Sequence, residues 1–263
     1  MTIQQRLEEI RKIVKNETRV VVSELSRQFD VTEETIRRDL YKLETEGLVT
    51  RTYGGAILNQ NITYENIDYR RREKTNPEEK REIAALAASV VPWNTTVCAD
   101  GSSTVAEALK MLSAHEGITV LTYSIKAIEN LADTKIRLVS TGGIVNSNTC
   151  AFEGMVTKKI IESFNTEFAL LSCKAINLDG GVYDSNEEEV ELKKRMIDHA
   201  SKTILLVDSS KFDRIAFAHM VDLERLYMLI TDKRPSDKWC DRLRKKGVKL
   251  LCPEQEEGSR GGE

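Results

Sequence analysis

The order of apolar and polar residues divides the chain into a short helical region and a longer region that alternates helices with strands. The first helix is expected to begin after Thr2, because apolar residues then recur every three or four positions. They are Ile3, Leu7, Ile10 and Val14. The β-branched run Val20–Val22 is too short for a helix and is expected to form a small strand.

Two further short helices are expected before residue 48, joined by a tight turn at Asp30-Val31. Ser23 is expected to cap the first and Thr32 the second, because hydroxyl oxygens accept hydrogen bonds from the free amides at a helix start. Gly47 is expected to end the second of these helices. Its apolar residues are spaced to lie on one side, at Ile36, Leu40 and Leu43.

A two-stranded wing is predicted next, from Leu48–Tyr53 and Ala56–Leu58 around the turn residues Gly54-Gly55. Residues 1–58 are therefore expected to form a winged helix-turn-helix domain. The polar side of its last helix presents Glu34, Arg38, Tyr41, Lys42 and Thr45, with Arg37 on the flank. A helix anchored on one side and carrying such groups on the other suits the major groove of DNA. A plain solvated helix face is the alternative, and the charges alone do not decide between the two.

From residue 80 to residue 253 the pattern alternates helical and β-rich segments. The expected strands are Thr95–Ala99, Ile118–Tyr123, Ile136–Ser140, Phe168–Cys173, Thr203–Val207, Tyr227–Ile230 and Val248–Leu251. The expected helices are Ile83–Val91, Val105–Leu112, Ile125–Leu131, Phe152–Phe164, Glu187–Ala200 and Asp237–Lys246. Repeated strand–helix units of this length predict an α/β domain with a mostly parallel sheet covered on both faces.

Residues 59–79 are expected to form a linker, and the polar tail 254–263 is expected to be disordered. The linker carries a basic run at Arg70, Arg71, Arg72 and Lys74. This run is interpreted either as a connector that touches DNA phosphates or the ligand of the second domain, or as an exposed, solubilising segment.

Composition excludes several classes of protein. A net charge of −3, with ten Lys/Arg and ten Asp/Glu in residues 1–58, argues against indiscriminate coating of nucleic acid. Affinity for DNA would have to come from well-placed charges around the last helix. The five cysteines are scattered without a CxxC pair and the three histidines are isolated, so we expect no disulfide framework, no metal site and no cofactor. The charged amino terminus and the lack of a long apolar run favour a cytosolic protein.

Polar residues gather where the predicted strands end, which is where open α/β sheets bind ligands. The first strand runs into Asp100, Gly101, Ser102, Ser103 and Thr104. Hydroxyls and free amides at a helix start can cradle a phosphate, although an ordinary helix cap would use the same residues. The other strand ends and helix starts contribute Thr122, Tyr123, Ser124, Gly142, Gly143, Lys174, Glu187 and Lys211. Together they suit a phosphorylated polyol, while Glu187 could equally serve the helix dipole.

The chain resembles the DeoR family of bacterial transcription regulators along nearly its whole length. In the first domain the resemblance rests on TIRRDL at Thr35–Leu40, the following LETEGLV, and YGGA at Tyr53–Ala56. In the second it rests on DGSST at Asp100–Thr104, STGG at Ser140–Gly143, SCKA at Ser172–Ala175, DSSKF at Asp208–Phe212 and LITD at Leu229–Asp232. Two departures are Tyr123, where the family usually has Asn, and Ala175, where Gly is common.

The resemblance implies a sensor domain similar in fold to ribose-5-phosphate isomerase, and a regulator of a sugar or polyol catabolic operon, most often a repressor. Its operator affinity would be controlled by a phosphorylated sugar, and it would act as a homo-oligomer, a dimer or tetramer. The implied DNA contacts are Ser23, Thr32, Glu34, Thr35, Arg37, Arg38, Lys42, Arg51 and Tyr53. For Arg37 a salt bridge to Glu33 is the alternative. An active sugar-phosphate isomerase is the competing function, which the first domain and the lack of a paired-carboxylate motif disfavour.

Overall fold

The computed structural model describes residues 3–17, 19–45, 49–52, 54–58 and 69–253. The chain divides into two compact units, Met1–Glu65 and Asn66–Glu263. The predictions for Gly47, Tyr53, residues 59–68 and the tail 254–263 lie outside the described residues.

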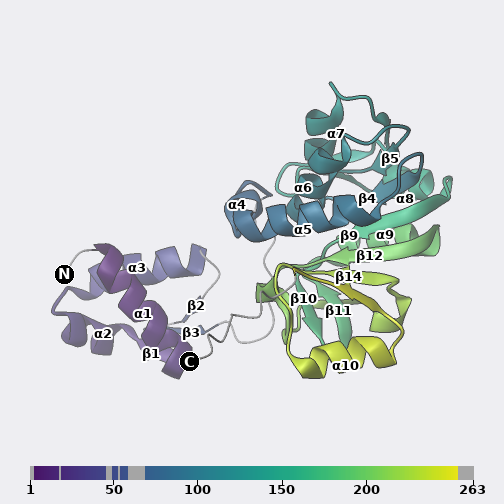
Figure 1. Cartoon of the computed structure of the whole chain (residues 1–263). Coiled ribbons are helices and arrows are strands. Elements are labelled where there is room, and N and C mark those ends of the chain that lie inside the picture. The colour runs from purple at the N-terminus through teal and green to yellow at the C-terminus, as the bar shows by residue number, and fades with distance from the viewer. Residues whose placement is uncertain (1–2, 18, 46–48, 53, 59–68, 254–263) are drawn as a thin grey trace, which may run out of the picture. The chain divides into compact units, whose positions relative to one another are not determined.

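The first unit is a three-helix domain with a small sheet, as its described residues show (Figure 1). Its elements are α1 (Ile3–Glu17), β1 (Arg19–Val21), α2 (Val22–Phe29), α3 (Glu33–Thr45), β2 (Val49–Thr52) and β3 (Gly55–Leu58). The two wing strands pair as predicted, and β1 joins them on the far side of β3 in the order β1-β3-β2. The described residues of this unit share one core, built from apolar residues of all three helices, including Ile10, Leu25 and Leu40.

The glycine pair of the wing has two different roles. Gly54 adopts φ +94°, which favours glycine in a turn, as predicted. Gly55 is required by a close approach instead, because a Cβ there would lie 2.1 Å from the carbonyl oxygen of Val20. The conformation of the turn therefore explains Gly54 but not Gly55.

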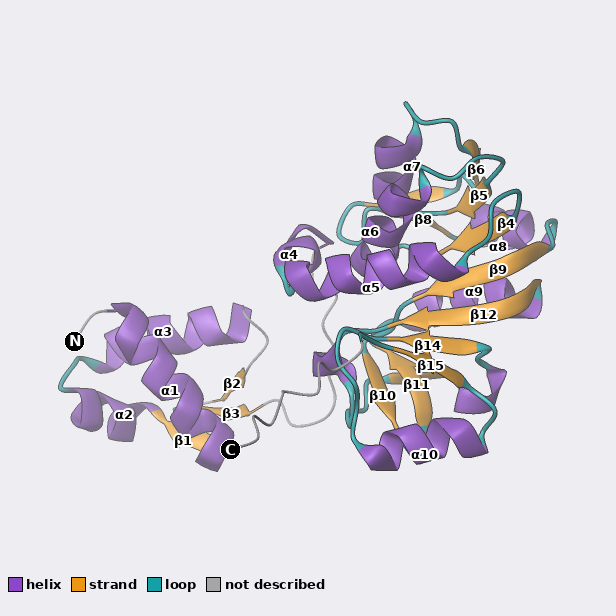
Figure 2. Ribbon diagram, in the orientation of Figure 1, coloured by secondary structure: helices purple, strands orange, loops and turns teal. Residues whose placement is uncertain are grey.

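The second unit is built on a parallel sheet, as predicted, and the described residues contribute seven strands (Figure 2). They are β4 (Thr96–Ala99), β5 (Thr119–Thr122), β6 (Arg137–Ser140), β9 (Thr166–Leu171), β12 (Ala200–Leu206), β14 (Met228–Ile230) and β15 (Lys249–Leu251). Their order is β15-β14-β12-β9-β4-β5-β6. The chain runs outward from β4 to β6 and then returns to β9 on the other side of β4, so the switch point of the topology lies between β4 and β9.

Helices cover both faces of this sheet (Figure 2). Their bounds are α4 (Tyr69–Lys74), α5 (Pro77–Val90), α6 (Ser103–Leu112), α7 (Ile125–Leu131), α8 (Met155–Glu162), α9 (Glu187–Asp198) and α10 (Asp237–Lys245). Helices α5, α6 and α7 pack on the face that holds Phe168 and Leu170. Helices α8, α9 and α10 pack on the opposite face, which holds Ala169 and Leu171. Alternate residues of one strand thus enter two different cores, which is why the strands read as continuous apolar runs.

Several short elements differ from the sequence predictions. Helices α4 and α5 begin at Tyr69 and Pro77, so residues 69–79 are mostly helical and belong to the second unit rather than to a linker. The helix predicted from Phe152 begins only at Met155, because Gly154, at φ +90°, separates it from a strand. That strand is β8 (Ala151–Glu153), which forms a hairpin with β7 (Ile144–Asn146).

The segment between the predicted strand Phe168–Cys173 and the predicted helix Glu187–Ala200 contains two further strands. Strands β10 (Ala175–Asn177) and β11 (Gly181–Asp184) pair with the distant β13 (Ala218–Val221) in an antiparallel sheet of the described residues. Two 3-10 turns, Ser209–Lys211 and Leu223–Arg225, complete the described elements.

Candidate functional site

Helix α3 is anchored in the first unit by both apolar and charged contacts. Ile36, Leu40 and Leu43 are fully buried, as their spacing predicts. Asp39 lies among them and is also buried, and its Oδ2 accepts a hydrogen bond of 2.6 Å from Nε of the buried Arg6 on α1. This ion pair joins α1 to α3 and fixes the orientation of the exposed side of α3.

Of the two helix caps predicted for α2 and α3, only the cap of α3 is present. Asp30 takes the left-handed conformation (φ 50°) that ends α2, and the Thr32 hydroxyl accepts from the Thr35 amide at 3.3 Å, so Thr32 caps α3 as predicted. The prediction that Ser23 caps α2 is wrong. The helix already begins at Val22, so Ser23 lies in its first turn and is half-buried.

The outward side of α3 carries two arginines with different partners. Arg37 is held by Glu33 at 2.6 Å, so the alternative salt bridge is present in the structure. Arg38 is looser: its side chain is 78% exposed and its Nε lies 3.7 Å from Glu34. The side chains of Glu34 and Lys42 are exposed, and Thr35 is half-buried with its hydroxyl 2.9 Å from that of Thr32. Arg38 is thus the arginine that could most readily turn toward a groove.

The wing is tied to α3 through Arg51. Its backbone amide and its Nε both donate to the Glu44 carboxylate, at 2.9 and 2.6 Å, and its guanidinium lies 5.1 Å from the centre of the exposed Tyr41 ring. Burial acts to raise the pKa of Glu44, but the hydrogen bonds and the positive charge of Arg51 outweigh it and hold that pKa below its usual value. Arg51 therefore positions the wing in this structure, whatever else it contacts.

In the second unit, Asp100 organises the switch point of the parallel sheet. It follows β4 and is completely buried. Its Oδ1 accepts from the Ser102 amide at 2.9 Å, and its Oδ2 accepts from the Ser172 amide, after β9, at 2.8 Å. The carboxylate thereby joins the two loops that follow the two central strands.

Lys193 of α9 lies against this carboxylate at the centre of a buried charged cluster that the sequence analysis missed. Its Nζ is 2.6 Å from Asp184, 3.3 Å from Asp100 and 3.5 Å from Glu189, and it also donates to the Ser172 carbonyl at 3.0 Å. Although burial alone would lower the pKa of Lys193, these carboxylates raise it well above its usual value. Burial likewise acts to raise the pKa of Asp184, and Lys193 reverses that and lowers it. Burial does raise the pKa of Glu189.

The hydroxyl residues at the strand ends mostly have structural partners. Ser102 and Ser124 accept from the amides of Val105 and Ala127, each at 3.2 Å, and so cap α6 and α7. The Thr122 hydroxyl donates to the Ala99 carbonyl at 2.8 Å. Ser103 and Thr104 are buried in the first turn of α6, and Tyr123 is 1% exposed beneath Gly101, where a Cβ would lie 3.0 Å from its ring. The alternative of an ordinary helix cap is therefore confirmed for Ser102, and Ser124 makes the same kind of cap although none was predicted there.

The other predicted ligand residues differ in exposure. The Gly142 carbonyl accepts from the Thr157 hydroxyl at 2.8 Å, and Gly143 has φ +127°. Lys174 is half-buried, as is Lys211, whose Nζ lies 4.0 Å from Asp208. Glu187 is exposed at the start of α9.

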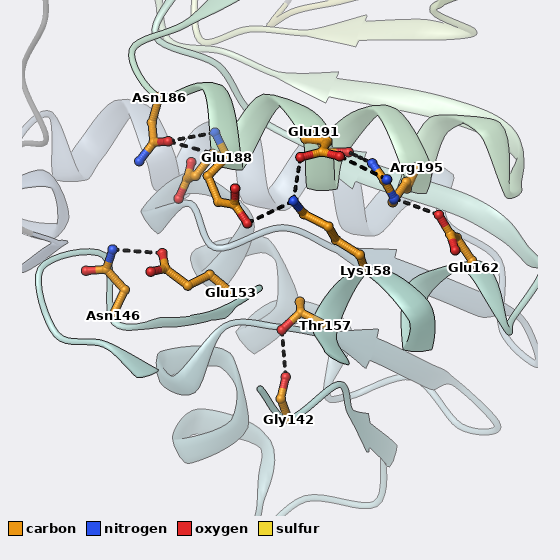
Figure 3. Close-up of polar contacts among 11 residues, drawn as sticks. Gly142, Asn146, Glu153, Thr157, Lys158, Glu162, Asn186, Glu188, Glu191 and Arg195 are labelled. Carbon is orange, nitrogen blue, oxygen red and sulfur yellow. Dashed lines mark hydrogen bonds and ion pairs between the residues drawn. The ribbon is translucent and has the colours of Figure 1, made fainter. Parts of the chain in front are cut away.

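Ion pairs hold the start of α9 against α8 (Figure 3). Lys158 of α8 contacts Glu188, at 3.1 Å, and Glu191. Asn186 caps α9 by accepting from the Glu188 amide at 2.8 Å. Both contacts fix the helix that carries Glu189 and Lys193.

A second set of contacts joins the strand ends to the turn between α4 and α5. Asn76 donates to Asp208 at 3.2 Å. Buried Lys80 donates to the carbonyls of Arg72 and Thr75, the latter at 2.5 Å, and burial lowers its pKa to about 8. A pocket of about 220 Å³ lies beside these helices and is lined by Tyr69, Glu73, Pro77, Lys80, Arg81, Ser103, Ala106, Glu107 and Lys110.

Among the described residues, no group of three or more His, Cys, Asp and Glu side chains could hold a metal ion. None of the described helices is long and apolar enough to cross a membrane.

Two family models match the chain. The DeoR-like helix-turn-helix domain matches residues 6–61, and the DeoR C terminal sensor domain matches residues 75–233. The chain is 40% identical to an HTH-type transcriptional regulator of Bacillus subtilis, YulB, over 88% of this chain and 90% of that protein. It is 34% identical to the B. subtilis HTH-type transcriptional repressor GlcR over 97% and 98%. The glycerol-3-phosphate regulon repressor of Escherichia coli is 30% identical over 88% and 91%.

Among solved structures, ribose 5-phosphate isomerase A of Methanocaldococcus jannaschii is similar to part of the chain. The match has a TM-score of 0.40 and 15% identity, over 52% of this chain and 55% of that one. A likeness of this size assigns no activity.

Proposed function

Because the chain belongs to the DeoR family of transcriptional regulators, we propose that it binds operator DNA through α3 and the wing and releases it when a phosphorylated sugar binds the second unit. One observation carries the proposal. The chain that holds the DNA-reading helix also holds a parallel sheet whose switch point gathers helix-start amides and charged side chains.

The proposed DNA contacts are those of the start of α2, the exposed side of α3 with its cap, and the wing: Ser23, Thr32, Glu34, Thr35, Arg37, Arg38, Lys42, Arg51 and Tyr53. Arg38 is the best supported, because its side chain is highly exposed and its ion contact is long. Arg37 and Arg51 would first have to leave Glu33 and Glu44. This is consistent with modest affinity that depends on placement rather than on net charge.

The effector is proposed to bind where β4, β5 and β9 end. Its phosphate would lie on the amides at the start of α6, because helix N-termini favour anions, and Lys174 and Lys211 are the cations predicted for this site. The name of the E. coli relative includes a phosphorylated polyol, which supports this class of ligand. A coupling of about 1–3 kcal/mol between the two sites would change operator affinity about 5- to 150-fold.

Repression by a homodimer or tetramer is also proposed. The two relatives named as repressors support the direction of control. A symmetric oligomer would place two α3 helices on two half-sites, which one charge-balanced module needs for firm binding.

Replacing Arg38 by alanine should weaken operator binding by about 1–3 kcal/mol if the guanidinium reads a base edge. The measurement is fluorescence anisotropy with a labelled duplex that the protein has selected from a random-sequence library. Arg11→Ala, on α1, removes the same charge and is the matched control. Equal affinity of Arg38→Ala and the wild type would remove Arg38 from the interface.

The effector class is tested by thermal unfolding with sugar phosphates. Both tryptophans, Trp93 and Trp239, belong to the second unit, so tryptophan fluorescence reports its unfolding alone. Ribose 5-phosphate, glucose 6-phosphate, fructose 6-phosphate and glycerol 3-phosphate are compared with their unphosphorylated forms and with inorganic phosphate. At least one phosphorylated compound should raise the melting temperature, because a ligand of the native state stabilises it. A shift from none of them would contradict the proposed effector.

A further inference from the structure

Four buried side-chain polar atoms have no hydrogen-bond partner among the described residues, and three of them belong to residues around the Lys193 cluster. They are Arg72 Nε on α4, Tyr123 Oη after β5 and Glu189 Oε1 on α9. Leaving such an atom unsatisfied costs about 1–3 kcal/mol, so native proteins rarely do so without a reason. Three of them from three separate segments of the chain indicate an incomplete polar site.

Geometry brings these residues around Lys193. Its Nζ lies 3.5 Å from Glu189 and 3.3 Å from Asp100, and a Cβ on the next residue, Gly101, would lie 3.0 Å from the Tyr123 ring. Burial acts to raise the pKa of both Glu189 and Asp184, and Arg72, after Lys193, acts in the opposite direction on both. After burial, Glu189 is the next contributor to the raised pKa of Tyr123. The Arg72 guanidinium also lies 5.4 Å from the centre of the buried Tyr69 ring, which holds it on the inner side of α4.

The charges of this cluster favour a neutral ligand group. Lys193 contacts three carboxyl groups, those of Asp100, Asp184 and Glu189, so the cluster already holds more acidic than basic groups around it. A phosphate here would lie beside three carboxyl groups. A hydroxyl can both donate and accept, so it can satisfy an arginine donor, a phenol and a carboxyl at the same time.

We propose that Arg72, Tyr123 and Glu189 bind adjacent hydroxyl groups of the effector's sugar, and that Arg72 thereby links α4 to the occupied site. This proposal rests on the proposed function and extends it, because it separates a hydroxyl-binding end from the phosphate-binding amides of α6. Helix α4 is the first described element after residues 59–68, which follow the wing. A ligand held by Arg72 therefore acts directly on the helix nearest in sequence to the DNA-binding unit.

Two variants test the proposal against a matched control. Tyr123→Phe removes only the hydroxyl, which the nearby Gly101 amide meets without a well-formed hydrogen bond, so the ligand-free protein should keep or slightly raise its melting temperature. Its affinity for ribose 5-phosphate, or for fructose 6-phosphate if only that compound shifts the wild type, should fall about three- to tenfold, the value of one hydrogen bond. Arg72→Gln should lower both this affinity and the release of DNA by the sugar phosphate. Arg137→Gln, which removes the same charge from an exposed position on β6, should change neither.

The outcomes distinguish a failure of the proposed effector from a failure of the proposed hydroxyl site. If no sugar phosphate binds the wild type, the proposed effector fails and this site fails with it. If the wild type responds and Tyr123→Phe and Arg72→Gln respond equally well, the effector stands and the hydroxyl site is wrong. A large loss of stability in ligand-free Tyr123→Phe would also overturn the proposal, because the hydroxyl would then have a structural role.

Discussion

Replacing Lys193 by alanine is expected to lower the free energy of unfolding of the second unit by about 3–5 kcal/mol, the usual effect of removing one partner from a buried ion pair. Asp100 and Asp184 would remain buried without the cation that lies 3.3 and 2.6 Å from them. Urea unfolding followed by tryptophan fluorescence measures the effect. Lys194→Ala is the matched control, since Lys194 is the exposed neighbour on α9 and its removal should cost less than about 0.5 kcal/mol.

The pH dependence of this variant provides a second check. Without Lys193, the buried carboxyl groups should have pKa values above those of the unfolded chain, so the folded state would bind more protons than the unfolded state. The deficit against the wild type should therefore shrink as the pH is lowered from 7 toward 5. A variant within about 0.5 kcal/mol of the wild type at pH 7 would show that the cluster is not held by Lys193.

Replacing Asp39 by alanine is expected to destabilise the first unit by a similar amount, about 3–5 kcal/mol, because Arg6 would be left buried and unpaired. Helix α3 would lose its charged contact with α1, and operator binding should fall at least tenfold. Hydrogen exchange followed by mass spectrometry, read on peptides from α1 and α3, measures the local stability, and anisotropy measures the binding.

The double variant Arg6→Met with Asp39→Leu is the control for this experiment. Apolar replacements of a buried ion pair are often neutral or stabilising, so it should regain slow exchange in both helices. If Asp39→Ala exchanges and binds DNA as the wild type does, the ion pair does not position α3.

The buried charged residues show what could be predicted from the sequence and what could not. Periodicity predicted the three helices of the first unit and the parallel sheet of the second, because long apolar stripes and runs leave few alternatives. The same stripes contained the missed site residues. Asp39 is three positions after Ile36 and four before Leu43, and Lys193 is three after Val190 and four before Ile197. A charge in such a position is a detectable signal, but its partners cannot be read from the chain, since Arg6 and Asp100 lie on distant segments.

The short antiparallel strands were missed for a related reason. Strand β11 pairs with β13, more than thirty residues away in sequence, and both are only four residues long. Such strands are determined by pairing rather than by local pattern. The sequence indicated Ser102 and Ser124 as ligand residues, because they follow strands of the parallel sheet. In the structure their side-chain oxygens accept hydrogen bonds from amides at the starts of α6 and α7, so the oxygens that a ligand would need are already in use.

The central claim is that a sugar phosphate bound in the second unit releases DNA held by α3. It is tested most directly by anisotropy of a protein-selected duplex, titrated with the sugar phosphate that stabilises the second unit and, in parallel, with inorganic phosphate. We expect the sugar phosphate to weaken DNA binding about 5- to 150-fold and inorganic phosphate to leave it unchanged. DNA affinity that stays constant while tryptophan fluorescence confirms that the sugar phosphate is bound would contradict the account.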